Sequence, residues 1–196
     1  MRGDPGRVRL VTPTTASWLL AALDGAGVTH VTGLPDSNLA ALLDLVADHP
    51  TIRWVPVTRE GEAFAVASGV WLGGGTPFVA VQSTGLFEAG DALRGTAQRM
   101  GVPLVVLVSY RGWTTHPHPG TAHPPDPDHL VRADVDSAAL WLEPTLSAWG
   151  VPYAFVGQDA DGSVDPDRDA RRVADAFASA ERDRRPVALL LNRRLV

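Results

Sequence analysis

The 196-residue chain contains no cysteine and no lysine. Without cysteine it can form no disulfide, no thiolate metal site and no cysteine nucleophile. No apolar run approaches the roughly 18–20 residues that span a bilayer, so we expect no membrane contact and a cytoplasmic location. The formal net charge of −5 also argues against a nucleic-acid partner, because such proteins carry basic surfaces.

Several signature motifs are missing as well. The glycine patterns GxGxxG and GxxxxGK[ST] do not occur, so a nucleotide-binding Rossmann or P-loop protein is poorly supported. The chain also lacks HExxH, a GxSxG elbow and a paired metal-ligand spacing. We therefore predict no metal site in this chain.

Short apolar runs alternate with segments of helical periodicity along the chain. The predicted strands are 28–33, 52–58, 77–83, 102–110, 152–157 and 186–192. The predicted helices are 37–49 (capped by Ser37 or Asp36), 62–72, 88–100, one that begins at Pro144, and 167–182. This alternation predicts one α/β domain over residues 1–196, a doubly wound parallel sheet flanked by helices.

The segment 111–134 is rich in proline and histidine and fits no regular element. It follows the central strand 102–110, at the edge of the sheet where ligands usually bind. Imidazoles and carboxylates are Zn²⁺ ligands, but the prolines between them oppose a compact cage. Because long loops in compact domains are usually functional or disordered, we predict a lid over the site or a contact with a partner.

Polar loops follow each of the first four predicted strands, and parallel strands bring such loops to one rim. In the second of these loops, Glu60 and Glu62 precede a helix of small apolar residues. The helix dipole alone favours acids there, by about 0.3–1 kcal/mol each. The surrounding glycines and alanines also permit close approach of another chain or a flat ligand. A carboxyl in such a contact can exchange a proton with a ligand nitrogen.

Five motifs occur in the same order as in the alpha subunits of sulfopyruvate and phosphonopyruvate decarboxylases. They are GLPDSN, TREGEA, QSTGL followed by DAL, SYRG, and LSAWGVPY. The similarity runs from about Val28 to Val156, and the chain resembles the pyrimidine-binding (PYR) domain of thiamine diphosphate enzymes. In that family a glutamate opens the helix after the second strand and a glycine follows nine positions later. Glu60 and Gly69 reproduce this spacing.

The resemblance implies that Glu60 is the catalytic carboxyl. In the family this group hydrogen-bonds N1′ of the cofactor's aminopyrimidine and thereby promotes loss of the proton from C2 of the thiazolium ring. Pro35 and Gln82 would bind thiamine diphosphate together with Glu60. Glu62 does not match the family position, so we assign it to the helix start or to a subunit interface.

The resemblance also implies that Ser37, Gln82 and Arg111 bind a 2-oxoacid substrate. A simpler role is open for each: a helix cap for Ser37, a loop hydrogen bond for Gln82 and a solvated surface position for Arg111. Arg111 follows the family's HRG-like corner, where Tyr110 replaces the histidine. The histidine-rich loop is a second departure, because the corresponding loop of the family lacks this run of histidines, and the resemblance therefore does not name the exact 2-oxoacid.

The family's GDG motif with following asparagines, which holds the diphosphate and Mg²⁺, is absent. The resemblance therefore implies a separate beta subunit whose pyrophosphate-binding (PP) domain binds both, in a hetero-oligomer built from dimers. The implied reaction is decarboxylation of phosphonopyruvate or sulfopyruvate to an aldehyde. An acetolactate synthase-like carboligase subunit and a non-catalytic PYR-like partner protein are the alternatives.

Overall fold

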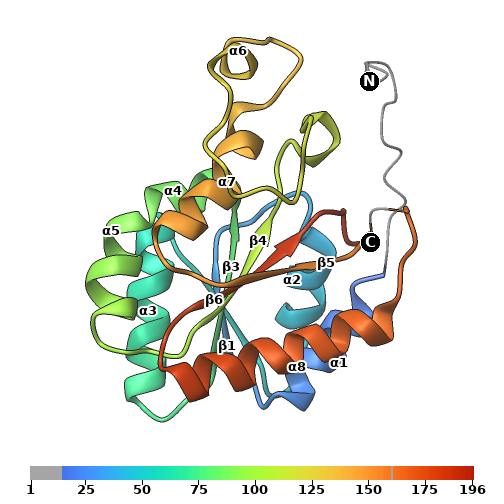
Figure 1. The fold of residues 1–196 in the computed structure, drawn as a ribbon. Coiled ribbons are helices and arrows are strands. Elements are labelled where there is room, and N and C mark those ends of the chain that lie inside the picture. The colour runs from blue at the N-terminus through green and yellow to red at the C-terminus, as the bar shows by residue number, and fades with distance from the viewer. Residues whose placement is uncertain (1–14, 160) are drawn as a thin grey trace.

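A computed structural model describes residues 15–159 and 161–196; the single-domain prediction for residues 1–14 and 160 lies outside the described residues. One six-stranded sheet runs through the described part, in the order β2-β1-β3-β4-β6-β5 (Figure 1). Every pair of neighbouring strands is parallel. The strands are β1 (His30–Gly33), β2 (Arg53–Pro56), β3 (Pro77–Gln82), β4 (Val105–Ser109), β5 (Tyr153–Val156) and β6 (Val187–Leu191). The predicted parallel α/β sheet is confirmed.

Helices cover both faces of the sheet (Figure 1). On one face lie α1 (Ser17–Gly25), α2 (Ala40–Ala47) and α8 (Pro166–Asp183). On the other lie α3 (Glu60–Leu72), α4 (Ser83–Glu88), α5 (Gly90–Ala92), the π-helix η1 (Leu93–Gln98) and α7 (Ser137–Ala148). The 3-10 helix η2 (Trp113–Thr115) and α6 (Pro127–Leu130) lie in the loop after β4.

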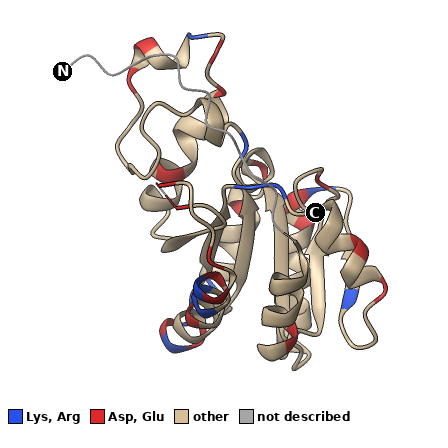
Figure 2. Ribbon diagram, turned by 90° about the vertical axis from the view of Figure 1, so that its right-hand side faces the viewer, with Lys and Arg blue, Asp and Glu red and all other residues tan. Residues whose placement is uncertain are grey.

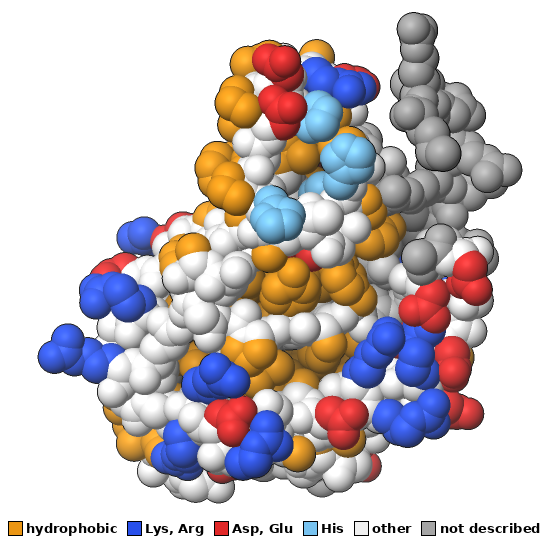
Figure 3. Space-filling model, viewed as in Figure 1, with side chains coloured by type: hydrophobic (Ala, Val, Ile, Leu, Met, Phe, Trp, Pro, Cys, Tyr) orange, Lys and Arg blue, Asp and Glu red, His pale blue; other side chains and the backbone are white. Residues whose placement is uncertain are grey.

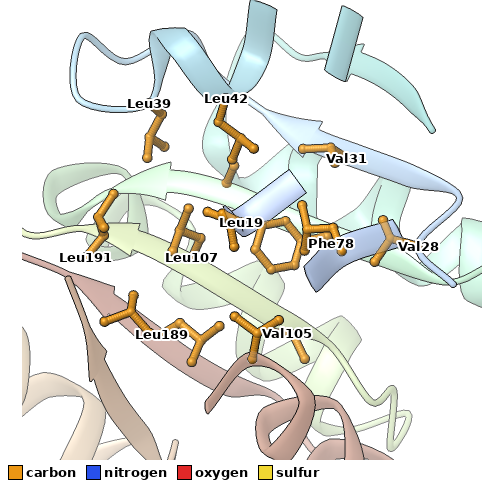
Figure 4. Close-up of a cluster of buried hydrophobic side chains, with 14 of the residues drawn as sticks. Leu19, Val28, Val31, Leu39, Leu42, Phe78, Val105, Leu107, Leu189 and Leu191 are labelled. Carbon is orange, nitrogen blue, oxygen red and sulfur yellow. The ribbon is translucent and has the colours of Figure 1, made fainter. Parts of the chain in front are cut away.

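The central strands β3 and β4 are apolar except for their last residues, Gln82 and Ser109, because both of their faces are buried. In β3, Phe78 and Ala80 enter the core under α1, α2 and α8, shown in Figure 4, whereas Val79 and Val81 enter the core on the opposite side. Strands β3, β4, β5 and β6 contain no charged residue, while α8 is strongly charged (Figure 2). The sheet is therefore a rigid platform that supports the loops at its carboxyl edge.

Several predicted helix boundaries are wrong. The helix predicted for 37–49 begins at Ala40 with Leu39 as its N-cap, so neither Ser37 nor Asp36 caps it. Instead, Asp36 Oδ1 accepts a hydrogen bond from the backbone N–H of Asn38 (2.6 Å) in the turn before the helix. The predicted helix 88–100 corresponds to α5 and η1, and α4 begins five residues before it, at Ser83.

The helix expected to begin at Pro144 in fact begins at Ser137. The side chain of Asp136 accepts a hydrogen bond from the N–H of Ala138 (3.0 Å), which is an ordinary N-cap. Pro144 lies inside the helix and is buried. Helix α1 was not predicted at all; its N-cap residue, Ala16, makes no side-chain capping bond.

The loop 111–134 rises above the carboxyl edge of the sheet (Figure 1). It is largely irregular, as predicted, but η2 and α6 interrupt it. Its middle is tied to α7 by a hydrogen bond from the Gly120 N–H to Glu143 Oε1 (2.8 Å). At its base, Arg111 Nε donates to Asp136 Oδ2 (2.7 Å).

Candidate functional site

The ends of β1, β3 and β4 and the start of α3 meet at the carboxyl edge of the sheet. Gln82 and Ser109, the last residues of β3 and β4, are partners in the register of these strands. At the end of β1, a Cβ on Gly33 would overlap the carbonyl oxygen of Ala80, so only glycine permits this close approach of β1 to β3. This packing brings the loop after β1 to the side of Gln82.

Glu60 is the first residue of α3 and is half-buried. Its side chain packs on Gly85 of α4, where an added Cβ would lie 2.5 Å from Glu60 Oε1. Among the described residues its carboxylate has no hydrogen-bond partner. A half-buried carboxylate without a hydrogen-bond partner in its own chain is available to a donor that comes from outside the chain.

Glu62 has a different environment. Its Oε2 accepts hydrogen bonds from the backbone N–H of Thr58 (3.0 Å), the Thr58 hydroxyl (2.9 Å) and the N–H of Arg59 (3.3 Å). These bonds, those from Thr58 first, hold the pKa of Glu62 below its ordinary value. Glu62 therefore satisfies backbone donors at the start of α3, one of the two roles expected for it.

Arg59 and Glu88 fasten the start of α3 to α4. Arg59 Nη2 lies 2.6 Å from Glu88 Oε1, and the N–H of Gly61 donates to Glu88 Oε2 (2.8 Å). The bond from Gly61, with that from Arg59, lowers the pKa of Glu88, and Glu88 in turn raises the pKa of Arg59. The pair holds the backbone of Glu60 in place without contacting its carboxylate.

A buried carboxylate, Asp36, lies beside Gln82. Asp36 is 9% exposed, and its Oδ2 accepts hydrogen bonds from the Ser109 hydroxyl (2.6 Å) and from Gln82 Nε2 (3.1 Å). Its Oδ1 accepts from the N–H of Asn38. The carboxylate thus links the loop after β1 to the ends of β3 and β4.

The other end of the Gln82 amide faces Arg111. Gln82 Oε1 accepts from the Thr84 hydroxyl (2.9 Å) and lies 3.5 Å from Arg111 Nη1. Arg111 is half-exposed and paired with Asp136, and its backbone N–H donates to the buried hydroxyl of Ser83 (3.0 Å). The structure therefore brings Gln82 and Arg111 together.

Pro35 and Ser37 are exposed on the loop between β1 and α2. In the part of the chain that the structure describes, the Ser37 hydroxyl makes no hydrogen bond. Both residues flank Asp36, so they lie at the same rim as Gln82. Their side chains are open to a ligand rather than committed to the fold.

The histidine-rich loop and Leu140 of α7 line a half-open cavity of about 300 Å³. Figure 3 shows histidine side chains grouped on this loop, which lies above the sheet. The rings of His118 and His129 lie 6.0 Å apart between centroids, and His116 is buried with its Nδ1 accepting from the N–H of His118 (2.9 Å). No group of three or more potential metal ligands is close enough to hold an ion within residues 15–159 and 161–196.

Residues 13–128 match the family described as thiamine pyrophosphate enzyme, N-terminal TPP binding domain, and the match covers more than half of the chain. The chain belongs to this family. None of the described helices is long and apolar enough to cross a bilayer.

Several proteins with similar sequences are decarboxylases. The chain is 27% identical to the sulfopyruvate decarboxylase subunit alpha of Methanococcus maripaludis over 88% of its own length and 90% of that protein's length. It is 42% identical to the phosphonopyruvate decarboxylase of Streptomyces viridochromogenes over 50% of this chain, but this covers only 24% of the relative. The chain thus spans about a quarter of the length of that relative.

Solved structures agree with this fold. Benzoylformate decarboxylase from Polynucleobacter necessarius superposes with a TM-score of 0.60 and 19% identity, covering 92% of this chain and 30% of that chain. A thiamin diphosphate-dependent enzyme from Mycobacterium smegmatis superposes with a TM-score of 0.59 and 18% identity, covering 94% and 33%. At these identities the likeness shows the fold alone.

Sequence reasoning missed Ser109 as a site residue and treated Asp36 only as a helix cap. Asp36 and Ser109 are far apart in the chain, so no local spacing connects them. A signal did exist: Ser109 is the one polar residue of β4, at its carboxyl end, as Gln82 is in β3. Polar residues at the ends of adjacent strands lie side by side.

Proposed function

We propose that this chain is the alpha subunit of a two-subunit, thiamine diphosphate-dependent decarboxylase of phosphonopyruvate or sulfopyruvate. The observation that carries the proposal is the Glu60 carboxylate, which packs against Gly85 without a hydrogen-bond partner among the described residues. The alignment with a sulfopyruvate decarboxylase alpha subunit over most of both chains supports the reaction class. The aligned phosphonopyruvate decarboxylase supports the second substrate.

The described residues fit one end of thiamine diphosphate. Glu60 offers an acceptor for a ring nitrogen of the aminopyrimidine, and Pro35 and Gln82 lie at the same rim. Within the described chain no group of three or more potential ligands could hold Mg²⁺. A beta subunit with a PP domain would supply that half of the site.

Glu60 holds and moves a proton in this proposal. Its carboxylate would accept a hydrogen bond from N1′ of the bound aminopyrimidine and so hold a proton at that atom. Acid–base assistance of this kind contributes about 10²–10⁴-fold to a rate. When bound, thiamine diphosphate supplies the carbon nucleophile that adds to the 2-oxo carbon and holds the electron pair left by departing CO₂. Uptake of one proton then balances the release of the aldehyde.

Ser37, Gln82 and Arg111 bind the anionic substrate. The hydroxyl of Ser37 and the guanidinium of Arg111 are exposed at the rim, and arginine can grip a sulfonate or phosphonate through two N–H groups. Asp136 neutralises part of the charge of Arg111, and the arginine keeps N–H groups that neither Asp136 nor Gln82 uses.

The outer face of α3 is suited to a partner subunit. Ala65, Gly69 and Leu72 are exposed on it, and Leu72 is 63% exposed. Nothing lies within 4 Å of the position that a Cβ on Gly69 would take, so another chain can approach the helix backbone there. We assign this face to contact with a second subunit.

Co-expression with the product of an adjacent reading frame that carries the GDG and asparagine motif tests the proposal. We expect tight thiamine diphosphate binding by calorimetry only when both chains are present, and release of CO₂ from sulfopyruvate or phosphonopyruvate. Analysis of the organic product separates an aldehyde from the longer product of a carboligase. Decarboxylation of neither acid by the two-chain complex would overturn the proposal.

A further inference from the structure

The Asp36 carboxylate is enclosed and receives three donors: Asn38 N–H, the Ser109 hydroxyl and Gln82 Nε2. An ionised carboxylate is an acceptor only, so three donors satisfy it well. Two of them come from the ends of β3 and β4, which belong to the rigid sheet. Asp36 is therefore a fixed acceptor at the rim, not a mobile surface acid.

A fixed acceptor decides which way the neighbouring amide points. The oxygen and nitrogen of a glutamine amide can exchange places by a flip, and the hydrogen-bond network determines the orientation. Because Asp36 cannot donate, the nitrogen of Gln82 must face it and the oxygen must face Thr84 and Arg111. The opposite orientation would place two acceptors in contact on one side and would leave donors unmatched on the other.

In this orientation the group of Gln82 that remains for a ligand is a hydrogen-bond donor. Thr84 and Arg111 occupy Gln82 Oε1, whereas Nε2 has two hydrogens and Asp36 takes one of them. We propose that Asp36 is a positioning residue that holds Gln82 as a hydrogen-bond donor to an oxygen of the bound 2-oxoacid. The inference rests on the proposed function, and it names the device by which that site selects an anionic oxygen.

The variant Asp36→Asn tests the link in the two-chain complex. The asparagine has a donor nitrogen that can face Gln82, so the glutamine amide can flip and present its oxygen to the substrate. Loss of a hydrogen bond to a charged group then raises KM about 10- to 100-fold, with a smaller change in kcat. Asp44→Asn, the same change at an exposed position of α2, is the matched control and leaves KM unchanged.

The double variant Asp36→Asn/Gln82→Glu separates positioning from stability. In the double variant the amide introduced at position 36 donates and the carboxylate introduced at position 82 accepts, which reverses the direction of the wild-type hydrogen bond. We therefore expect the melting temperature to recover while KM stays high. An unchanged KM in Asp36→Asn, or recovery of both quantities in the double variant, would overturn the inference. If Asp36→Asn does not fold, Ser109→Ala removes one donor that holds Asp36 and should raise KM by a smaller factor; an unchanged KM there has the same meaning.

A spectroscopic measurement on the full chain is independent of turnover. In a ¹⁵N spectrum we expect the Gln82 side-chain amide, identified by its loss in Gln82→Glu, to exchange slowly and to shift in Asp36→Asn. An amide signal with the same exchange rate and chemical shift in Asp36→Asn as in the wild type would contradict the inference. If the wild-type complex decarboxylates neither acid, the proposed function fails, and this signal still shows whether Asp36 orients Gln82.

Discussion

Glu60 begins α3 and Glu143 lies within α7, and both helices pack on the same face of the sheet. The two carboxylates nevertheless differ in how many hydrogen bonds they accept. Glu143 is fully buried and accepts bonds from the hydroxyls of Tyr110 and Tyr153 (2.9 Å each) and from the N–H of Gly120 (2.8 Å). Glu60 is half-buried and accepts none among the described residues.

This difference in hydrogen bonding distinguishes a structural role for Glu143 from the functional role proposed for Glu60. A buried charge whose acceptor sites are filled by its own chain stabilises the fold, and here it fastens the loop 111–134 to α7 and β5. A half-buried carboxylate whose acceptor sites the chain leaves unfilled can accept a donor from outside, either water or a ligand. The comparison makes Glu143 the anchor of the loop and supports the cofactor contact proposed for Glu60, so substitutions at the two sites should have separate consequences.

The largest effect is expected from Glu60→Gln. No hydrogen bond within the described chain depends on the charge of Glu60, so the melting temperature should stay close to that of the wild type. Turnover of the two-chain complex should fall about 10²–10⁴-fold because the amide cannot stabilise the proton on the pyrimidine. Exchange of the C2 proton of bound thiamine diphosphate, followed by NMR, should slow in parallel.

Glu181→Gln, at an exposed position of α8, is the control for Glu60→Gln and should retain full activity. Near-normal turnover in Glu60→Gln would remove the distinction between the two glutamates. A large loss of stability in that variant would show that Glu60 is, like Glu143, part of the fold.

The second effect is a loss of stability in Glu143→Ala. The substitution leaves the Tyr153 hydroxyl and the Gly120 N–H without their acceptor, while the Tyr110 hydroxyl keeps only the carbonyl oxygen of Ala139 (3.1 Å). The loss should lower the free energy of unfolding by about 2–4 kcal/mol. Urea unfolding measures it, and limited proteolysis should show faster cleavage near Gly120. Glu143→Gln, which keeps an acceptor oxygen, should lose less. Equal stability of Glu143→Ala and wild type would contradict the anchor role.

The fold was largely predictable because buried parallel strands have a strong local signature. The runs around β3, β4 and β6 are apolar except for Gln82 and Ser109 at the ends of β3 and β4, and each predicted strand lies within a few residues of the observed one. Helix starts were less predictable because they depend on single capping contacts. Pro144 is a residue type common at helix starts, but Asp136 provides the cap.

Only those site residues that lie in a single local sequence motif could be predicted. Glu60 stands at a helix start, in a motif that a resemblance identifies. Asp36 and Ser109 contact each other only because β1 and β4 flank β3 in the sheet, and this proximity is a property of the topology. The same holds for Glu143, whose partners are Tyr110 directly after β4, Tyr153 of β5 and Gly120 of the loop.

A third prediction uses the fact that the chain has two tyrosines, and both bind Glu143. Burial, followed by the nearby Glu143 carboxylate, raises the pKa of Tyr110, and the same causes raise the pKa of Tyr153. Both protons are thus held more tightly in the folded chain than in the unfolded chain, where the pKa is about 10. The resulting stability is complete below about pH 10 and is lost as the pH rises above it.

Ultraviolet absorbance of tyrosinate measures this directly. The native chain should show no titration near pH 10, and both tyrosines should titrate near pH 10 in denaturant. Tyr110→Phe should make the alkaline loss of stability less steep. A native chain that titrates both tyrosines at the ordinary pH would contradict the enclosed network around Glu143.

The smallest effects are expected at Asp136, which joins the two regions at the base of the loop. Asp136→Asn keeps a good N-cap for α7 and removes only the ion pair with the half-exposed Arg111, which should cost about 1 kcal/mol or less. Asp136→Ala also removes the cap and should cost about 1 kcal/mol more. Urea unfolding of the two variants at low and high salt separates these contributions, because salt screens the ion pair and leaves the cap intact. Equal losses in both variants would mean that the ion pair with Arg111, and not the cap, holds the loop base to α7.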